Sequence, residues 1–191
     1  MKLNFHLVVA ASLGFTATVA AHPPGTCPPP TGPETFGLVA INSGGPAHYA
    51  GFNAARRGLF AGYSGQNADC EDGPDSGFAT FYIEDGALYL YGPANQQFFV
   101  DRSGMGQGIV GYMNDGETGP RNGELTGWSI NAENNHLQFD GSDFLACPLD
   151  DGYRIWAAQG FQTPGGSQNC VGVAARVERI SDPNSCTYTS S

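Results

Sequence analysis

The sequence predicts an all-β fold, a single-domain β-barrel or two-sheet β-sandwich of about ten to twelve short antiparallel strands. Two observations lead to this prediction. Glycine occurs 28 times and proline 13 times, and from Phe36 onward these turn-forming residues recur at short intervals. Between them lie short runs rich in Phe, Tyr, Val and Ile, a composition typical of strands. The runs do not repeat at a fixed period, so we exclude a propeller or a solenoid.

Twelve runs have this strand pattern. In chain order they occupy residues 36–42, 47–53, 58–63, 78–84, 87–92, 96–101, 109–113, 127–132, 136–140, 143–148, 153–158 and 171–177. In the run "ALYLYG", Leu88 and Leu90 alternate with Tyr89 and Tyr91. Successive side chains of a strand point to opposite faces. The leucines and the tyrosines therefore lie on opposite faces of the predicted sheet.

Two Asp-Gly pairs between strand runs predict tight hairpins. Asp85-Gly86 separates "FATFYIE" from "ALYLYG", and Asp151-Gly152 stands in "LDDGYRI". Both central positions of a type I′ turn need positive φ, which glycine and aspartate tolerate better than most residues. We expect a two-residue turn at each pair.

The N-terminus predicts export. Residues 1–21 have one early positive charge, an apolar stretch and small residues before position 22, which is the layout of a secretory signal peptide. Residues 22–35 are rich in proline, which fixes φ and removes amide donors, so we predict an extended arm. The all-β domain then spans residues 36–180, and residues 181–191 form a polar C-terminal tail. No later run approaches the ~18 apolar residues of a membrane-spanning helix, so we expect no membrane insertion.

The charge of the chain excludes two classes of partner. The sequence has 18 acidic and 8 basic residues, and its only lysine is Lys2, inside the predicted signal peptide. Binding to a phosphate backbone depends on a dense Lys/Arg surface, so we expect no nucleic acid partner. Anionic membrane surfaces also repel such a chain.

The cysteines predict structural disulfides, since an exported chain meets an oxidising compartment. The five cysteines are Cys27, Cys70, Cys147, Cys170 and Cys186. Cys147 ends one strand run and Cys170 stands at the head of another, and a bridge closing that loop would contribute about 3 kcal/mol in the chain-entropy model. One pair among the other three cysteines allows three choices. We favour Cys70–Cys186, which leaves Cys27 on the arm.

The alternative role for Cys147 is that of a reactive thiol. A thiol nucleophile needs a lowered pKa and a partner base, whereas Pro148 follows Cys147 and the carboxylates of Asp150 and Asp151 would raise the thiol pKa. The chain contains no G-x-S-x-G motif and no distinct Ser/His/Asp set. We therefore predict no catalytic residues and no enzyme activity.

The sequence offers two possible metal sites, and each has a simpler interpretation. The acidic segment Asp69–Asp75 has oxygen ligands of the kind that calcium prefers, but its spacing fits no EF-hand, and a solvated acidic loop is the reading we favour. His22 would be the first residue after cleavage, and a copper brace would join it to His48 or His136. A proline-rich arm is a poor support for such a site. We expect no metal and no cofactor.

Aromatic residues make up 12% of the chain, and most of them must serve the core of a β protein. A few on the surface would form a platform for glycans. The aromatic residues considered for it are Tyr49, Tyr63, Tyr89, Tyr91, Tyr112, Tyr153, Trp128 and Trp156. Of these, we select Tyr89, Tyr91 and Trp128 as the glycan contacts.

Several segments, in their order along the chain, resemble a known family. They are "FGLVAINSGGPAHYAGFNAARRGLFAG", "VDRSG", "LACP" and "CVG". This order resembles the fungal secreted PhiA-type cell-wall proteins, whose relatives are labelled IgE-binding or hypersensitive-response-inducing (elicitor) proteins. The resemblance implies a small all-β extracellular protein of the hyphal or conidial wall, with no active site to carry over. It also implies that Cys147 and Cys170 match the two most recognisable cysteines of the family. The arm and the segment "NADCEDGPDSG" depart from the family pattern.

These observations predict a secreted, non-enzymatic fungal protein of the extracellular space and cell wall. It would act through surface contacts with wall polysaccharide or host proteins. One alternative is an elicitor or effector that a host senses and that has no wall affinity. Another is a carbohydrate-active enzyme, either copper-dependent or hydrolytic. The sequence does not specify an oligomeric state.

Overall fold

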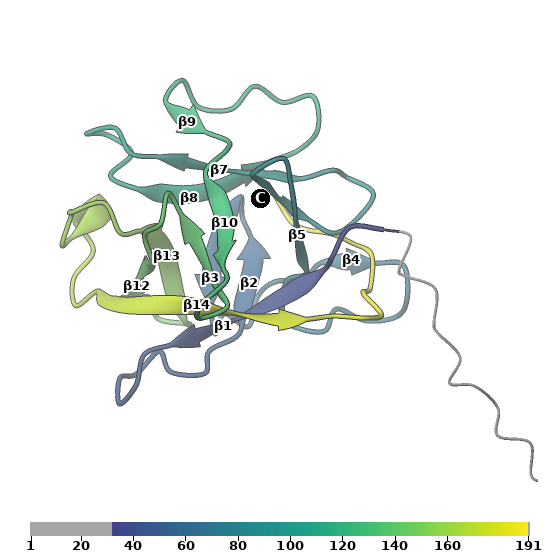
Figure 1. Ribbon diagram of the computed structural model, residues 1–191, viewed down its shortest axis with the longest axis horizontal. Coiled ribbons are helices and arrows are strands. Elements are labelled where there is room, and N and C mark those ends of the chain that lie inside the picture. Colours follow the sequence, from purple (N-terminus) through teal and green to yellow (C-terminus); the bar gives the residue numbers. More distant parts are fainter. Residues whose placement is uncertain (1–31, 191) are drawn as a thin grey trace, which may run out of the picture.

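The computed structural model describes residues 32–190, which form a large antiparallel sheet of thirteen strands and a small sheet of two (Figure 1). The predicted signal peptide 1–21, Cys27 and most of the predicted arm 22–35 lie outside the described residues. No helix among residues 32–190 is long and apolar enough to cross a bilayer. The prediction of an all-β fold of short antiparallel strands is confirmed.

The fifteen strands follow the turn-separated runs of the sequence. They are β1 (Phe36–Ile41), β2 (Phe52–Ala55), β3 (Gly58–Ala61), β4 (Asp69–Cys70), β5 (Phe81–Glu84), β6 (Ala87–Leu90), β7 (Gln97–Asp101), β8 (Ile109–Met113), β9 (Gly123–Glu124), β10 (Trp128–Asn131), β11 (His136–Phe139), β12 (Phe144–Pro148), β13 (Tyr153–Ala157), β14 (Val171–Arg179) and β15 (Cys186–Thr187). Each of the twelve predicted runs overlaps one strand. The three strands without a predicted run, β4, β9 and β15, have two residues each.

Strand pairing can be followed around the core. The main path through the large sheet is β1-β5-β6-β7-β8-β3-β13-β12-β14-β11-β10, and β2 pairs with β3 and β9 with β7 beside this path. Strand β1 also pairs with β14 along its whole length, from Phe36↔Arg179 to Ile41↔Ala174. The pairing between β1 and β5 is limited to Phe36↔Phe81. One curved sheet therefore wraps a common core, with β1 beside both β5 and β14.

Aromatic side chains fill this core from end to end. Ring centroids lie 6.0 Å apart for Phe36 and Phe81, 5.8 Å for Phe81 and Phe98, and 6.2 Å for Phe98 and Trp128. Phe139 continues the series at 5.0 Å from Trp128. Each of these side chains is at most 2% exposed, and burial of one such aromatic contributes about 2–3 kcal/mol relative to leaving it in water.

The prediction of Trp128 as a glycan contact is wrong. Its side chain is 2% exposed because Trp128 pairs with Phe139 across β10 and β11 and both residues face the core. The neighbouring Ser129 takes the outward position. Trp128 is a core residue.

One of the two predicted hairpin turns forms as expected. Asp85 has φ of 49° and Gly86 has φ of 77°, and Glu84 pairs with Ala87 across the turn. The prediction of a two-residue turn at Asp151-Gly152 is wrong, because the pairing of β12 with β13 ends at Pro148↔Tyr153 and leaves a four-residue connection. Gly152 is still required there, since a Cβ would lie 2.7 Å from the Ala61 carbonyl oxygen.

The cysteine pairs are those that the sequence favours. Cys147 on β12 is bonded to Cys170, just before β14, at a sequence separation of 23. Cys70 is bonded to Cys186 at a separation of 116. The second bond joins β4 to β15, so the segment after residue 180 does not extend as a free polar tail. Tyr188 in that segment is 2% exposed.

Candidate functional site

Three tyrosines lie together on the outer surface of the hairpin formed by β5 and β6. Tyr82 and Tyr89 are directly opposite each other, and their rings stack with centroids 5.1 Å apart and planes inclined by 15°. Tyr91 lies two residues after Tyr89. All three side chains are half-buried, while Leu88 and Leu90 point into the core, as the alternation predicts. We call Tyr82, Tyr89 and Tyr91 the tyrosine face.

Tyr82 is the member of this face that the sequence analysis missed. The signal was present, since a two-residue turn at Asp85-Gly86 pairs position 84 with 87 and therefore position 82 with 89. Side chains directly opposite on neighbouring strands lie close enough to interact. Extending the hairpin register by two residues would have placed Tyr82 beside Tyr89.

The hydroxyl of Tyr82 stays protonated. It lies 3.4 Å from the Asn95 side-chain oxygen, to which it donates a hydrogen bond. Burial raises the pKa of Tyr82 above its ordinary value, and the neighbouring Glu84 and Tyr89 raise that pKa further. The tyrosine face therefore presents apolar rings together with hydroxyl groups, a combination suited to ligands that are part apolar and part hydroxylated.

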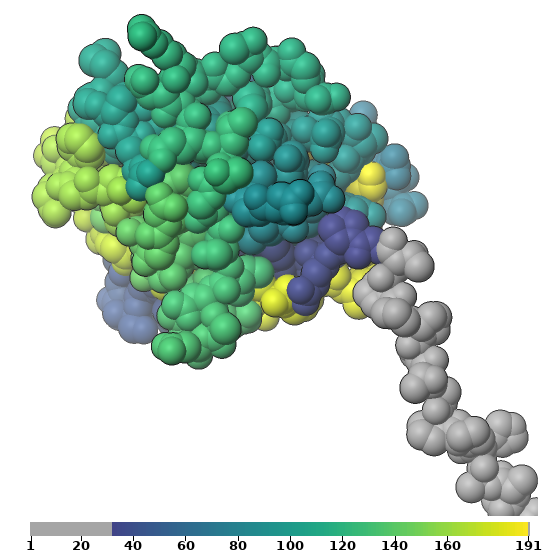
Figure 2. Space-filling model, turned by 45° about the horizontal axis from the view of Figure 1, so that its top comes forward, coloured from purple at the N-terminus to yellow at the C-terminus, as the bar shows by residue number. Residues whose placement is uncertain are grey.

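Hollows flank the stacked tyrosine pair. A groove of about 400 Å³ adjoins Tyr82 and Tyr91, and Figure 2 shows the teal residues of this hairpin beside the purple start of the described chain. Its lining residues are Pro33, Tyr82, Glu84, Tyr91, Gly92, Pro93 and Ser185. A smaller hollow of about 180 Å³ adjoins Tyr89. Its lining residues are Tyr89, Asn95, Gln97, Met113, Asn114, Asp115, Gly116 and Glu117.

The C-terminal segment holds one wall of the groove. The backbone N–H of Cys186 donates to the Tyr91 carbonyl oxygen at 3.1 Å, next to the groove residue Ser185. The two backbones are so close that a Cβ on Gly92 would lie 1.9 Å from the Cys186 carbonyl oxygen. Position 92 therefore requires glycine, and the Cys70–Cys186 disulfide fixes the strand that supports Tyr91.

The same segment is tied down by buried polar side chains. The Gln96 side-chain nitrogen donates to the Tyr188 carbonyl oxygen at 2.8 Å, and its side-chain oxygen accepts from the Tyr188 backbone N–H at 2.9 Å. The hydroxyl of Tyr188 accepts from the Thr80 backbone N–H at 2.9 Å. Burial raises the pKa of Tyr188 above its ordinary value. These bonds connect the C-terminal segment to residues on both sides of the tyrosine hairpin.

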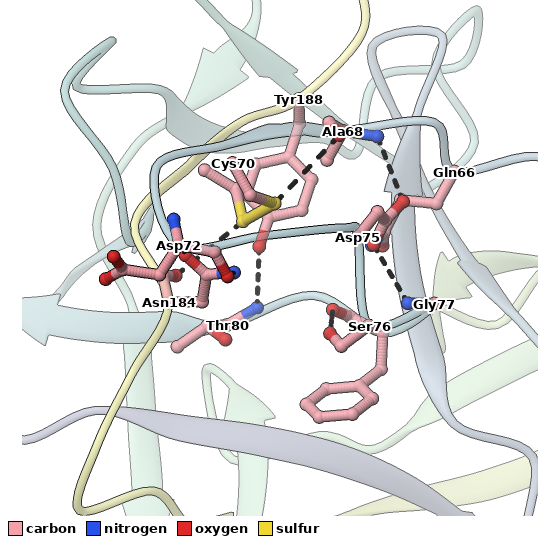
Figure 3. Close-up of a disulfide and its surroundings, with 12 residues drawn as sticks. Gln66, Ala68, Cys70, Asp72, Asp75, Ser76, Gly77, Thr80, Asn184 and Tyr188 are labelled. Atoms are coloured by element: carbon pink, nitrogen blue, oxygen red, sulfur yellow. Dashed lines mark hydrogen bonds between the residues drawn. A yellow bond between two sulfur atoms is a disulfide. The ribbon is translucent and has the colours of Figure 1, made fainter.

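The acidic segment Asp69–Asp75 is a structural loop (Figure 3). The Asp75 carboxylate accepts hydrogen bonds from the Gln66 side chain at 2.6 Å and from the backbone N–H groups of Ala68 and Gly77 at 3.0 and 2.9 Å. We call residues 66–80, with residues 184–188, the disulfide corner. Because both oxygens of Asp75 already accept N–H groups, this carboxylate is poorly placed to bind calcium. Residues 32–190 contain no group of three or more His, Cys, Asp or Glu side chains placed to hold a metal.

The copper brace considered from the sequence is not tested by the described residues. His22 lies outside the described residues. The Nδ1 atom of His48 accepts a hydrogen bond from the Asn42 backbone N–H at 3.1 Å, and its ring lies 3.9 Å from that of Tyr49. His48 therefore stabilises the turn after β1.

A third hollow differs from the first two in its chemistry. It has a volume of about 240 Å³ and is almost wholly apolar. Its lining residues are Gly37, Leu38, Val39, Gly51, Phe78, Glu178 and Ile180. A hydroxylated ligand would lose hydrogen bonds with water there without replacing them. The tyrosine face is therefore the better candidate for binding a hydroxylated polymer.

Comparison with known proteins finds matches over the whole domain. A family model described as PhiA-like secreted protein matches residues 36–189. A protein named cell wall protein phiA from Emericella nidulans is 58% identical over 194 residues, which cover 100% of both chains. A protein of the same name from Aspergillus fumigatus is 50% identical over 186 residues, covering 95% of this chain and 96% of its own. The protein of that name from Aspergillus niger is 48% identical over 183 residues, covering 94% and 97%. No solved structure matches.

Proposed function

This chain belongs to the PhiA-like secreted protein family, and from that premise we propose that it is a non-enzymatic protein of the fungal cell wall that contacts wall polysaccharide through the tyrosine face. The name of its relatives, cell wall protein phiA, supports the location. The resemblance expected from the sequence motifs is confirmed at the level of the family.

The observation that carries the contact proposal is the stacked pair of Tyr82 and Tyr89 between two hollows. A pyranose ring has an apolar C–H face and a rim of hydroxyl groups. Aromatic rings bind the apolar face, and the tyrosine hydroxyls with Asn95 and Gln97 offer partners to the rim. Because the hollows continue on both sides of the pair, they suit a chain of sugar units better than a single sugar.

The non-enzymatic part of the proposal is supported by how the reactive groups are used. The cysteines of the described chain are all in disulfides. Asp75 is hydrogen-bonded on both oxygens, and Glu117 is bonded to the Arg57 guanidinium at 2.7 Å. Carboxylates that hold loops together are unsuited to exchanging protons with a substrate.

Retention on insoluble polysaccharide tests the contact. We expect the secreted protein to be retained on chitin or β-glucan and Tyr82→Ala/Tyr89→Ala to lose about tenfold in affinity, since a stacked aromatic contributes roughly 1–2 kcal/mol. Tyr49→Ala is the matched control, because Tyr49 is 67% exposed and outside the tyrosine face. No retention of the natural protein on either polymer would remove the proposal. A tissue response after infiltration of plant leaves, together with no retention, would instead support the elicitor alternative.

A further inference from the structure

We infer that the tyrosine face selects polysaccharide with free, protonated amino groups, a glucosamine polymer, over neutral N-acetylated chains and glucans. This inference rests on the proposed function and names the class of polymer that the face prefers. Two observations carry it, the sign of the charges that line the hollows and the place of Glu84 in the groove.

The charged residues that line the two hollows are all acidic. They are Glu84 in the groove and Asp115 and Glu117 in the smaller hollow. Glu117 is paired with Arg57, whose charge compensates it. The carboxylates of Glu84 and Asp115 have no ion-pair partner in the part of the chain that the structure describes. A cation entering either hollow therefore meets an uncompensated negative charge.

The surroundings add to this preference. All 18 acidic residues lie after residue 31, against seven arginines. Four of those arginines, Arg57, Arg102, Arg176 and Arg179, are in ion pairs. The net charge of the protein is therefore negative, which favours the approach of a cationic polymer. Neutral chitin and glucan gain nothing from this charge.

Glu84 gives the preference a local component. It shares the groove with Tyr82 and Tyr91, so a sugar stacked on a tyrosine there has its rim close to a carboxylate. A protonated amino group at that rim donates a charge-assisted hydrogen bond, which is stronger than a bond from an acetamide or a hydroxyl group. Because Glu84 is exposed, water and salt screen the interaction, and we expect a moderate effect of about three- to tenfold.

The experiment must separate this local effect from general attraction between a polyanion and a polycation. Binding of glucosamine, N-acetylglucosamine and β-glucan hexasaccharides is measured by calorimetry at mildly acidic pH, at low and at high ionic strength. The variants are Glu84→Gln, Tyr82→Ala/Tyr89→Ala and Glu133→Gln. Glu133 is exposed in the connection between β10 and β11 and lines neither hollow, so its replacement changes the net charge equally.

The inference predicts that the glucosamine hexasaccharide binds about tenfold more tightly than the other two at low ionic strength. Glu84→Gln removes most of that advantage, Glu133→Gln keeps it, and the double tyrosine variant binds all three about tenfold more weakly. Equal, tyrosine-dependent binding of the three sugars overturns the inference and leaves the proposed function standing. The inference is also overturned if glucosamine binding is unchanged in the double tyrosine variant and falls equally in Glu84→Gln and Glu133→Gln. Binding of none of the three overturns the inference and the proposed function together.

Discussion

The disulfide corner and the tyrosine face are neighbours that use their polar groups differently. In the corner, the Asp75 carboxylate accepts a hydrogen bond from the Gln66 side chain, whose oxygen accepts one from the Ala54 backbone N–H, and Gln66 is 1% exposed. On the face, the rings of Tyr82 and Tyr89 stack on each other, and Glu84 is exposed. The difference indicates that the corner stabilises the fold while the face is available to a ligand.

The two regions are nevertheless connected at Tyr91, whose backbone N–H donates to the Thr80 carbonyl oxygen at 2.8 Å. The Cys186 backbone N–H bonds the Tyr91 carbonyl oxygen, and Gly92 allows the close approach. The corner therefore supports the groove and forms part of its wall at Ser185. Substitutions in the corner should reduce stability first and binding as a consequence, whereas substitutions on the face should reduce binding with little loss of stability.

Removal of the Cys70–Cys186 disulfide should have the largest effect on stability. The bond closes a loop of 116 positions, and the Cys70→Ser/Cys186→Ser variant should lose about 4–5 kcal/mol of the free energy of unfolding. Chemical denaturation measures this loss. The still-folded fraction should also bind polysaccharide more weakly, because the wall of the groove at Ser185 is released.

The other disulfide is the control for this comparison. Cys147→Ser/Cys170→Ser opens a loop of 23 positions and should lose about 3 kcal/mol, with unchanged polysaccharide binding by the folded fraction. Equal polysaccharide binding by the two variants would contradict the different roles assigned to the two disulfides. A larger loss of stability in Cys147→Ser/Cys170→Ser than in Cys70→Ser/Cys186→Ser would also contradict them.

Replacement of Asp75 should have the next largest effect. Asp75→Asn keeps the shape of the side chain but leaves a backbone N–H of the corner without its acceptor, which costs about 1–3 kcal/mol. Asp72→Asn is the matched control, since Asp72 is bonded to Asn184 through its backbone, and we expect a change within about 0.5 kcal/mol. Thermal or urea unfolding of the two variants measures the difference, and equal stabilities would contradict the assigned role.

The fold could be predicted because its signals are local. Alternating apolar and polar residues mark the strands. The Asp85-Gly86 pair and the spacing of glycine and proline mark the turns. Each of these signals lies within a few positions of the chain. The error for Trp128 has a different cause. In "WSIN" the apolar Trp128 and Ile130 alternate with the polar Ser129 and Asn131. This pattern already indicates a buried Trp128, and the pairing with Phe139 agrees with it.

The support of the groove beside the tyrosine pair depends on contacts that local patterns do not contain. The bonds between Gln96 and Tyr188 join residues 92 positions apart, and the pairing of β1 with β14 joins the two ends of the domain. Such contacts follow from the three-dimensional order of the strands. For this reason, composition predicted a polar tail at residues 181–191, whereas residues 184–188 belong to the disulfide corner.

Substitutions on the tyrosine face should have a smaller effect on stability than those in the corner. Tyr82→Ala removes a half-buried ring and its stacking with Tyr89, and we expect a loss of about 1 kcal/mol. Denaturation of the Tyr82→Ala and Asp75→Asn variants under the same conditions tests which of them loses more of the free energy of unfolding. A loss for Tyr82→Ala that exceeds the loss for Asp75→Asn would make the face part of the structural core.

The smallest expected effect is the pH dependence caused by Glu117. Hydrogen bonds from Arg57, then from Asn114, lower the pKa of Glu117 from 4.5 to about 2. Because the folded pKa is the lower one, the charged carboxylate stabilises the fold above pH 4.5, and this contribution is lost as the pH falls toward 2. The difference in stability between the natural protein and Glu117→Gln should therefore shrink over that range. A difference that grows on acidification would contradict the assignment.

Hydroxyl-radical footprinting of the folded, secreted protein on insoluble wall polysaccharide tests the contact at the tyrosine face most directly. The account predicts that oxidation of Tyr82, Tyr89 and Tyr91 falls when the polymer is present, while Tyr49, 67% exposed, is oxidised as in the free protein. Protection of Tyr49 alone, or unchanged oxidation of all four tyrosines on a polymer that retains the protein, would contradict it.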